Sequence, residues 1–420
     1  MIKKYFKSEF VKNIVILISS SGISQLIPFL ILPILQKYFY SPQDFGELTL
    51  YVTLSLMLVK FSTFSYELAI VKQQSEKNAL SIFKGSVIIL FITTTLIALV
   101  LVSMTLFYSH NFYVKNLHSS LFLIPFSVFS FGFYQILRYW FNWKSEFKVI
   151  GGSMITKSIS AETTKLLLGY LKSGSMGLVV GRLLGELFSF LHLFYFFLKE
   201  DYQKLKKIQL LDIKELLKSN YQFPLYSMPS GLKGTLISLI FISLFTKYFG
   251  LSNAGIIGVS VSYIAAGFGI VSQSFSQVFY KRIYELKGLE LFNMLKKNVF
   301  LLAFISASIV LVIHSIPNSF IANLLGPQWI DFMPVLKILI FAISISFITS
   351  SVSFIYIRMN RQKEMLFFDV FHLALVTSSI ILGNYFTQDF MQTLIWYVIA
   401  QIIYYIFALF LAFYFVKKSY

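Results

Sequence analysis

The sequence has no cysteine, so it offers neither a disulfide framework nor a thiolate nucleophile. It also lacks the glycine-rich Walker A motif that cradles nucleotide phosphates, so the chain carries no ATPase of its own. No cluster of metal ligands and no pairing of a nucleophile with a base is visible. We therefore expect no catalytic residues, no metal site, no cofactor and no enzymatic activity.

Charged residues are also scarce, at 13% of the chain, whereas 57% of the residues are hydrophobic and the mean hydropathy is +0.73. Apolar runs long enough to cross a bilayer recur along the sequence, which indicates an all-α polytopic membrane protein. A net charge of +18 would suggest a nucleic-acid partner in a soluble chain. In a membrane protein the excess lysine and arginine instead sets orientation, so we expect no nucleic-acid partner.

Hydropathy and length predict about 12 transmembrane helices, with ends uncertain by about four residues. These spans are 13–36, 46–70, 84–108, 119–140, 150–171, 176–198, 221–246, 254–279, 298–317, 332–356, 365–386 and 391–416.

Most lysine and arginine residues gather on one side of these spans. They lie before residue 13 and in 72–84, 138–148, 199–218, 281–297, 358–363 and 417–418. The loops on the other side carry only Lys37, Lys115, Lys172 and Lys247. Because the more basic loops stay in the cytoplasm, both termini are expected to be cytoplasmic.

A Lys-Tyr-Phe tripeptide occurs at 37–39 and again at 247–249, half the chain length later. Each copy follows a span that contains prolines, and each precedes a short polar loop with a glycine, Gly46 or Gly255. Such a repetition at the midpoint predicts two six-helix halves in the same orientation, related by an axis along the membrane normal.

The predicted domains are an N-terminal six-helix bundle over 1–198, a basic cytoplasmic linker over 199–220 and a C-terminal six-helix bundle over 221–420. The linker is mildly amphipathic. A simple connector is the favoured interpretation of it, and a segment that lies on the anionic leaflet is the alternative.

The two spans between 150 and 198 contain charged residues. These are Lys157, Glu162, Lys165, Arg182 and Glu186. A charge at the bilayer centre costs about 2.5–3.5 kcal/mol, so such residues face a cavity or pair with one another. The three charged residues of the span 150–171 fall within an arc of about 140° around the helix, which leaves its other flank free to face lipid. Local pairs are plausible between Glu162 and Lys165 and between Arg182 and Glu186.

Lys60 and Lys233 are predicted near the middle of their spans, and no acidic residue lies one helical turn from either. A lysine so placed favours a water-filled vestibule that an anion can enter. Cations outnumber carboxylates inside the spans, so this cavity should attract negative charge. The candidate substrate-binding residues of the cationic cavity are Lys60, Lys157, Lys165, Lys233 and Arg182. They indicate an anionic amphiphile or a phosphate-bearing substrate.

Asp369 and His372 lie three residues apart in the span 365–386. They could share a helix face and relay a proton or bind a cation. A satisfied polar pair near the end of the span is the favoured interpretation.

The stretch K-Y-F-Y-S-P-Q-D-F-G-E-L-T-L-Y over 37–51, placed between the first two spans, resembles the beginning of O-antigen-type flippases. These Wzx-like proteins form the polysaccharide transporter branch of the multidrug/oligosaccharidyl-lipid/polysaccharide flippase superfamily. The number of spans, the basic middle loop and the two halves extend the resemblance over the whole chain.

The resemblance implies a bacterial inner-membrane protein that flips undecaprenyl-pyrophosphate-linked oligosaccharide repeat units by alternating access. Its fold would be MATE-like, with two bundles around a central cationic cavity. On this basis Lys60, Lys157, Lys165 and Lys233 would meet the pyrophosphate or acidic sugars. Asp369 or Glu67 would take part in coupling to H⁺ or Na⁺. Membrane lipids and a glycan polymerase of the same pathway are the expected partners.

Two alternatives remain at this point. Multidrug exporters of the same superfamily typically place an acidic residue in the first span, and residues 13–36 contain none. A membrane-embedded glycan polymerase or acyltransferase would be expected to show a large outer loop or buried catalytic histidines and arginines. The predicted outer loops are short, which counts against it.

Overall fold

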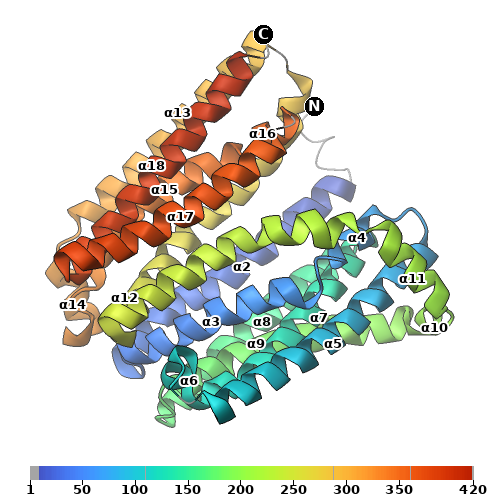
Figure 1. The fold of residues 1–420 in the computed structure, drawn as a ribbon, viewed down its shortest axis with the longest axis horizontal. Helices are drawn as coiled ribbons and strands as arrows, with labels where there is room; N and C mark the ends of the chain where they lie inside the picture. Colours follow the sequence, from blue (N-terminus) through green and yellow to red (C-terminus); the bar gives the residue numbers. More distant parts are fainter. Residues whose placement is uncertain (1–8, 109, 287, 360, 419–420) are drawn as a thin grey trace. The chain divides into compact units, whose positions relative to one another are not determined.

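The structure is a computed structural model that describes residues 9–108, 110–286, 288–359 and 361–418. Every regular element in these residues is a helix (Figure 1). The helices fall into two compact units. Unit 1 consists of the residues up to Tyr40 together with Glu47–Leu239, and unit 2 consists of Ser41–Gly46 together with Ile240–Tyr420.

Unit 1 holds the helices of the first half of the chain, of which α3 also contributes its first turn to unit 2. They are α2 (Glu9–Tyr38), α3 (Pro42–Ser62), α4 (Glu67–Lys72), α5 (Glu76–Phe107), α6 (Phe112–Leu117), η1 (His118–Leu123), α7 (Ile124–Trp143), α8 (Phe147–Tyr170), α9 (Ser175–Glu200), α10 (Tyr202–Lys206), α11 (Leu210–Ser219) and η2 (Phe223–Ser227).

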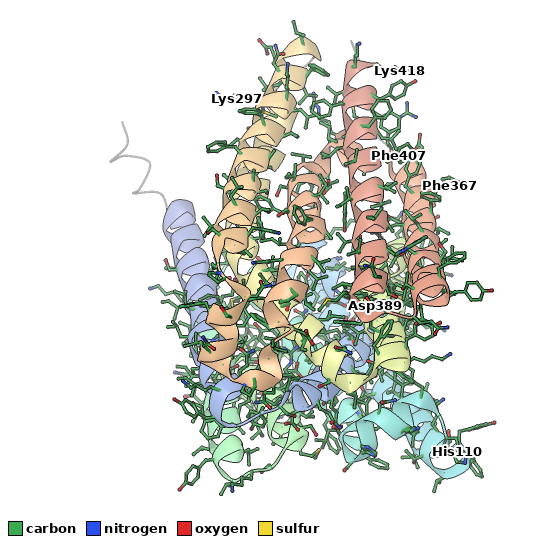
Figure 2. All side chains as sticks on the ribbon, turned by 90° about the vertical axis from the view of Figure 1, so that its left-hand side faces the viewer. His110, Lys297, Phe367, Asp389, Phe407 and Lys418 are labelled. Carbon is green, nitrogen blue, oxygen red and sulfur yellow. The ribbon has the colours of Figure 1, made fainter. Side chains whose placement is uncertain are left out.

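Unit 2 holds the remaining helices, and α12 begins in unit 1. They are α12 (Met228–Glu285), α13 (Gly288–Ser315), α14 (Asn318–Leu325), η3 (Pro327–Trp329), α15 (Phe332–Val352), α16 (Phe354–Arg358), α17 (Gln362–Thr387) and α18 (Phe390–Lys417). Figure 2 follows α18 from Asp389 past Phe407 to Lys418, beside the antiparallel α17.

Each predicted span falls on a helix. By length and composition, 10 helical segments of the described residues could cross a membrane. That number is below the predicted one for two reasons. The predicted spans 221–246 and 254–279 share α12, which has non-helical backbone at Gly250. In addition, α8 carries too many charged residues to count as a membrane-spanning helix by composition alone.

The second span is shorter than predicted. Apolar residues continue to Ile70, but α3 ends at Ser62, and Phe64 and Ser65 take positive φ angles of 49° and 59°. A turn follows, and α4 begins at Glu67. Lys60 therefore lies in the last turn of α3 and not near the middle of a span, so that prediction is wrong.

The start of α3 is fixed by local chemistry. The backbone N–H and the hydroxyl of Ser41 donate to Asp44 Oδ2 at 2.8 and 2.7 Å, and the Asp44 N–H donates back to Ser41 Oγ at 3.3 Å. This is a capping box, with Pro42 at the first helical position. The next residue, Phe45, packs edge-on against Trp329 at 5.5 Å between ring centroids.

Helices α3 and α12 cross in close contact at two glycines of unit 2. A Cβ atom on Gly46 would lie 1.9 Å from the carbonyl oxygen of Leu251, and one on Gly255 would lie 1.9 Å from the carbonyl oxygen of Pro42. The contact is reciprocal, because each glycine meets the carbonyl four residues before the other one. The two glycines are the ones that follow the repeated tripeptide. The predicted relation between two six-helix halves, with 199–220 as linker, stays a prediction.

Unit 1 has an aromatic core between α5, α7 and α9. Phe83 stacks on Phe197 at 4.6 Å between centroids and meets Trp140 edge-on at 6.0 Å. All three rings are buried. Such ring pairs contribute beyond their buried area, so they fix the three helices against one another.

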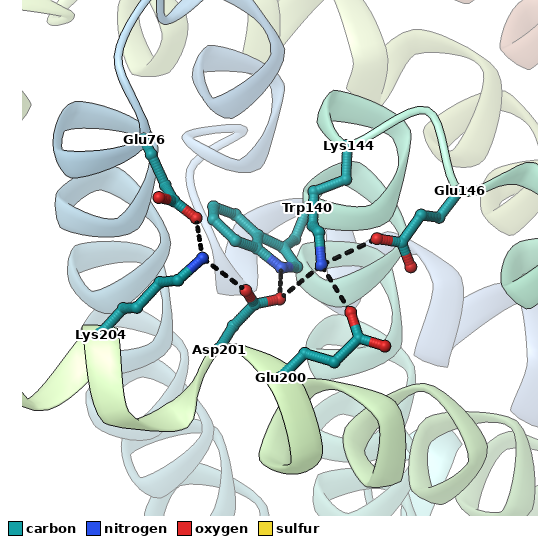
Figure 3. A network of polar contacts seen from close by, with 7 residues as sticks. All are labelled: Glu76, Trp140, Lys144, Glu146, Glu200, Asp201 and Lys204. Atoms are coloured by element: carbon teal, nitrogen blue, oxygen red, sulfur yellow. Dashed lines mark hydrogen bonds and ion pairs between the residues drawn. The ribbon is translucent and has the colours of Figure 1, made fainter.

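A polar network closes one end of this core (Figure 3). The fully buried Asp201 accepts a hydrogen bond from Trp140 Nε1 at 2.8 Å and lies 3.1 Å from Lys144 Nζ. Lys144 also pairs with Glu146 and Glu200, each at 2.8 Å. On the other side of Asp201, Lys204 pairs with Glu76 at 2.5 Å. The network ties together the ends of α5, α7, α9 and α10.

Replacing Lys144 is expected to weaken the fold in a pH-dependent way. Burial lowers the pKa of Lys144, but its carboxylate partners outweigh burial and raise that pKa above the usual range. Such a lysine stabilises the fold fully below the unfolded-state pKa of about 10.4, and the contribution is lost as the pH rises through the folded-state pKa. Lys144→Gln should lower the free energy of unfolding by about 1–2 kcal/mol at pH 8, discounted for partial exposure.

Denaturation of purified protein in detergent, from pH 7 to pH 11, tests this expectation. The difference in unfolding free energy between the wild type and Lys144→Gln should shrink above about pH 10. The exposed Lys148→Gln is the matched control and should change nothing. A wild type no more stable than Lys144→Gln at pH 8 would contradict the role of Lys144.

Candidate functional site

The charged helix α8 has two distinct faces. Beyond its first turn, its well-exposed side chains are Ile159, Thr163, Leu167 and Tyr170, which recur at helical spacing. Lys157, Glu162 and Lys165 lie on the opposite side, where α8 packs against α9. This arrangement agrees with the predicted division of the helix into a lipid-facing flank and a charged flank.

Three glycines four residues apart let α9 approach α8 closely. They are Gly177, Gly181 and Gly185. A Cβ atom on Gly181 would lie 2.5 Å from Lys165 Cγ, and one on Gly185 would lie 2.9 Å from the carbonyl oxygen of Lys157. Small residues at this spacing are typical of tightly packed transmembrane helices. The close approach brings the charged residues of the two helices together.

Two local ion pairs form within these helices, as predicted. Lys165 Nζ lies 2.6 Å from Glu162 Oε1, and Arg182 Nε lies 2.6 Å from Glu186 Oε1. Both carboxylates are almost completely buried. Buried charges persist when they are paired and hydrogen-bonded, so these pairs explain how two acids are tolerated at this depth.

Glu186 is also held by neighbouring helices. Its second oxygen accepts a hydrogen bond from Ser127 Oγ at 2.7 Å, and Ser127 Oγ accepts one from the Tyr51 hydroxyl at 2.8 Å. Tyr51 lies on α3 and Ser127 on α7. A polar chain thus links α3, α7 and α9 to Arg182. No local sequence pattern predicts this chain of hydrogen bonds, because the partners are far apart in the sequence.

Lys157 has a different environment. Its Nζ lies 4.3 Å from the ring centroid of Phe131 and 5.9 Å from that of Tyr134. None of the ion pairs found among the described residues involves it. The charges of Arg182, Glu186, Arg138 and Lys165 act on it. The cluster of α8 and α9 thus holds three basic side chains and two carboxylates, and the aromatic ring faces attract the ammonium form of Lys157.

Breaking the Arg182–Glu186 pair is expected to destabilise unit 1. Glu186→Gln keeps the shape of the side chain but removes the charge that faces Arg182. Because the Arg182 side chain is 27% exposed, water limits the loss to about 1–2 kcal/mol of unfolding free energy. Thermal unfolding in detergent measures it, with the exposed Glu215→Gln as control.

A double variant sharpens that test. Replacing both partners by methionine removes the stranded charge, so Arg182→Met/Glu186→Met should be at least as stable as Glu186→Gln. A Glu186→Gln protein that unfolds at the wild-type temperature would show that the pair does not stabilise the fold.

The other candidate residues lie apart from α8 and α9. Lys60 is half-buried in the last turn of α3, where its charge acts on Glu67. Burial raises the pKa of the Glu67 carboxyl, although a hydrogen bond from Thr63 at 2.5 Å and the charge of Lys60 oppose this shift. Lys233 is half-buried in the second turn of α12.

Asp369 and His372 belong to unit 2, on α17, and both contact Tyr404 on α18. The Tyr404 hydroxyl donates to Asp369 Oδ1 at 3.2 Å, and its ring stacks on the His372 imidazole at 3.6 Å. His372 Nε2 lies 2.7 Å from Gln401 Oε1, and Gln401 Nε2 donates to the Tyr397 hydroxyl at 2.8 Å. This buried network favours a packed polar cluster over an open ion site.

Comparison with known structures identifies the fold. A multidrug resistance MATE family transporter of the MOP superfamily, in an inward-facing conformation, aligns with a TM-score of 0.69 at 15% identity, covering 96% of this chain and 95% of that one. The lipid II flippase MurJ, in an inward closed conformation, aligns with a TM-score of 0.66 at 13% identity, covering 96% and 90%.

A third similar structure is a MOP superfamily transporter from Pyrococcus furiosus, whose binding pocket is described as having reverse polarity that suggests a different function. It aligns with a TM-score of 0.56 at 15% identity and covers 96% of this chain and 94% of that one. No curated protein matches the sequence.

The helical fold, the apolar spans and the likeness over nearly the whole chain define a multi-pass membrane protein with the MATE-like fold. The polysaccharide biosynthesis protein family matches residues 10–247, which is more than half of the sequence. The chain therefore belongs to that family and has the fold of the MOP superfamily structures with which it aligns. Its structural neighbours are described as multidrug transporters and a lipid II flippase.

Proposed function

We propose that the protein flips undecaprenyl-pyrophosphate-linked oligosaccharide repeat units across the bacterial inner membrane by alternating access. Membership of a polysaccharide biosynthesis family supports a glycan-bearing lipid as the substrate class. The likeness to MATE and MurJ structures supports a fold that can host a lipid-linked cargo. The proposal includes no catalytic activity, in keeping with structural neighbours that are described as transporters and a flippase.

The observation that carries the proposal is the excess of basic over acidic side chains in the α8–α9 cluster. Both of its carboxylates are engaged by cations of the same helix, while Lys157 rests against aromatic rings. In a medium of low dielectric constant, such a charge is much more strongly attracted to a phosphate than it would be in water. A pyrophosphate or an acidic sugar supplies the missing negative charge.

The remaining candidate residues have supporting roles in this proposal. Lys165 and Arg182 could exchange their carboxylates for substrate phosphate, because both keep part of their surface exposed at 14% and 27%. Lys60 and Lys233 would guide the anionic head group. Asp369, His372 and Glu67 would couple transport to H⁺ or Na⁺ by changing their protonation or ligation.

The membrane arrangement completes the proposal. Both termini would lie in the cytoplasm, an orientation that the basic loops support. Two six-helix bundles, 1–198 and 221–420, would rock against each other, joined by the linker 199–220. A glycan polymerase of the same pathway would receive the flipped units on the outer leaflet.

Purified protein in proteoliposomes tests the substrate. The probe is a fluorescent undecaprenyl-pyrophosphate-linked oligosaccharide, and a membrane-impermeant reductant reports the fraction in the outer leaflet. We expect rapid exchange with protein and none without it. A neutral glycolipid of equal tail length is the matched control and should stay in its leaflet. Drug-driven transport with an immobile glycolipid would support multidrug export, and covalent change of the glycolipid would support a polymerase or acyltransferase.

Removing the guiding lysines should slow transport moderately. Lys60→Ala and Lys233→Ala are each expected to lower the flipping rate about threefold to tenfold, the effect of one charge–charge contact in a partly hydrated site. Insertion and abundance should stay near wild type, which immunoblotting of membranes checks. Normal transport in the double variant Lys60→Ala/Lys233→Ala would remove these residues from the proposed cavity.

A further inference from the structure

The segment between α9 and α12 is a folded part of unit 1. Lys84 Nζ donates to the carbonyl oxygen of Ile208 at 2.8 Å, and Lys77 pairs with Asp212 at 3.0 Å. The Tyr66 hydroxyl donates to the carbonyl oxygen of Leu217 at 3.2 Å. These contacts come from α5 and from the turn before α4, so they fix α11 against the helices of unit 1.

The contacts also fix the depth of α11 relative to α5. A Cβ atom on Gly85 would lie 3.0 Å from Ile213 Cγ2, so α11 packs directly on α5 at this residue. From Gly85 to Phe107, α5 carries no charged residue. A membrane-spanning helix needs about 20 predominantly apolar residues, and this charge-free part of α5 is long enough to be one. α11 therefore packs beside α5 where its charged first turns meet this membrane-length segment.

The outer face of α10 and α11 combines apolar and basic residues. Leu210 and Leu211 are 72% and 76% exposed, although Ile213 on the inner face is buried. Around the two leucines lie four exposed lysines. They are Lys206, Lys207, Lys214 and Lys218. Glu215 is the exposed carboxylate on the same face of α11.

We propose that this α10–α11 face binds anionic phospholipid head groups of the adjacent leaflet, with Leu210 and Leu211 inserted between acyl chains. Exposed leucines beside lysines match the chemistry of an amphipathic helix that lies in the membrane interface. The excess of lysine over carboxylate selects anionic over zwitterionic head groups. The proposal does not depend on which cargo the protein moves.

The absence of cysteine makes a direct test possible, because Leu211→Cys gives a single labelling site in the full-length protein. The site is labelled with a fluorophore and the protein is placed in phosphatidylcholine vesicles. Two vesicle preparations are compared. One contains spin-labelled phosphatidylglycerol as quencher, and the other contains the same amount of spin-labelled phosphatidylcholine. We expect quenching by the anionic lipid to be about fivefold more efficient, the enrichment expected for one lysine–head-group contact.

A quadruple variant and a matched control complete the test. Replacing Lys206, Lys207, Lys214 and Lys218 by glutamine should abolish the preference. Replacing Lys37, Lys115, Lys172 and Lys247 by glutamine removes the same charge elsewhere and should preserve it. Equal quenching by both lipids, quenching by aqueous iodide instead of lipid, or a preference that survives the first quadruple variant would each overturn the proposal.

Discussion

Gly255→Ala is expected to lower the free energy of unfolding by about 3 kcal/mol or more, because the added methyl group has no space. Its Cβ would lie 1.9 Å from the carbonyl oxygen of Pro42 and 2.6 Å from the amide nitrogen of Gly46. Both atoms belong to the backbone, so no side chain can rotate away. The start of α3 would have to separate from α12.

The same helix provides a matched control. A Cβ on Gly234 would meet nothing within 4 Å, so Gly234→Ala should stabilise the helix by up to about 1 kcal/mol through helix propensity. Thermal unfolding in detergent, followed by size-exclusion chromatography, compares the two variants. Equal stability of Gly255→Ala and wild type would contradict the close contact.

Combining two substitutions tests whether the contact is reciprocal. Gly46→Ala opens the same crossing from the other side, since its Cβ would lie 1.9 Å from the carbonyl oxygen of Leu251. Once one added methyl group has separated α3 from α12, the second methyl group should lower the free energy of unfolding by a smaller amount. The double variant Gly46→Ala/Gly255→Ala should therefore lose less stability than the sum of the single variants. Additive losses would indicate two independent sites.

Lys157→Met is expected to slow flipping of a pyrophosphate-linked glycolipid about 10-fold to 100-fold, the effect of losing one charge-assisted contact to phosphate. Folding should not suffer, because methionine fills a similar volume and no carboxylate among the described residues is left without its cation. A buried charge without a carboxylate partner opposes folding, so the variant should unfold at or above the wild-type temperature.

Two further variants separate charge from structure. Lys157→Arg keeps a cation that can rest on Phe131 and Tyr134, and it should retain most of the activity. Lys172→Met removes an exposed lysine just beyond α8 and should leave transport unchanged. Rates are compared at equal amounts of inserted protein. Wild-type flipping by Lys157→Met would exclude Lys157 from the transport path.

The positions of the helices and the local ion pairs could be predicted because their signals are local in sequence. The predicted spans lie largely on helices, and the pairs Lys165–Glu162 and Arg182–Glu186 join residues one turn apart on one helix. Ser127 escaped prediction because it meets Glu186 only after α7 and α9 pack together.

One error of position and one missed contact have physical causes. Lys60 was predicted within a longer span because apolar residues run past Ser62, and hydropathy does not detect the left-handed turn at Phe64 and Ser65. Similarly, the repeat indicated that Gly46 and Gly255 correspond, but not that they touch. Contact between residues about half the chain length apart depends on the packing of helices, for which a single sequence has no signal.

The most direct test of the central claim locates the cargo in cells. In a strain that lacks the gene, lipid-linked oligosaccharide is extracted after labelling of the outer leaflet with an impermeant glycan-directed reagent. The account predicts complete repeat units that accumulate unlabelled on the cytoplasmic leaflet, with release by the intact gene but not by Lys157→Met. Units that reach the outer leaflet at the normal rate without the protein would contradict it.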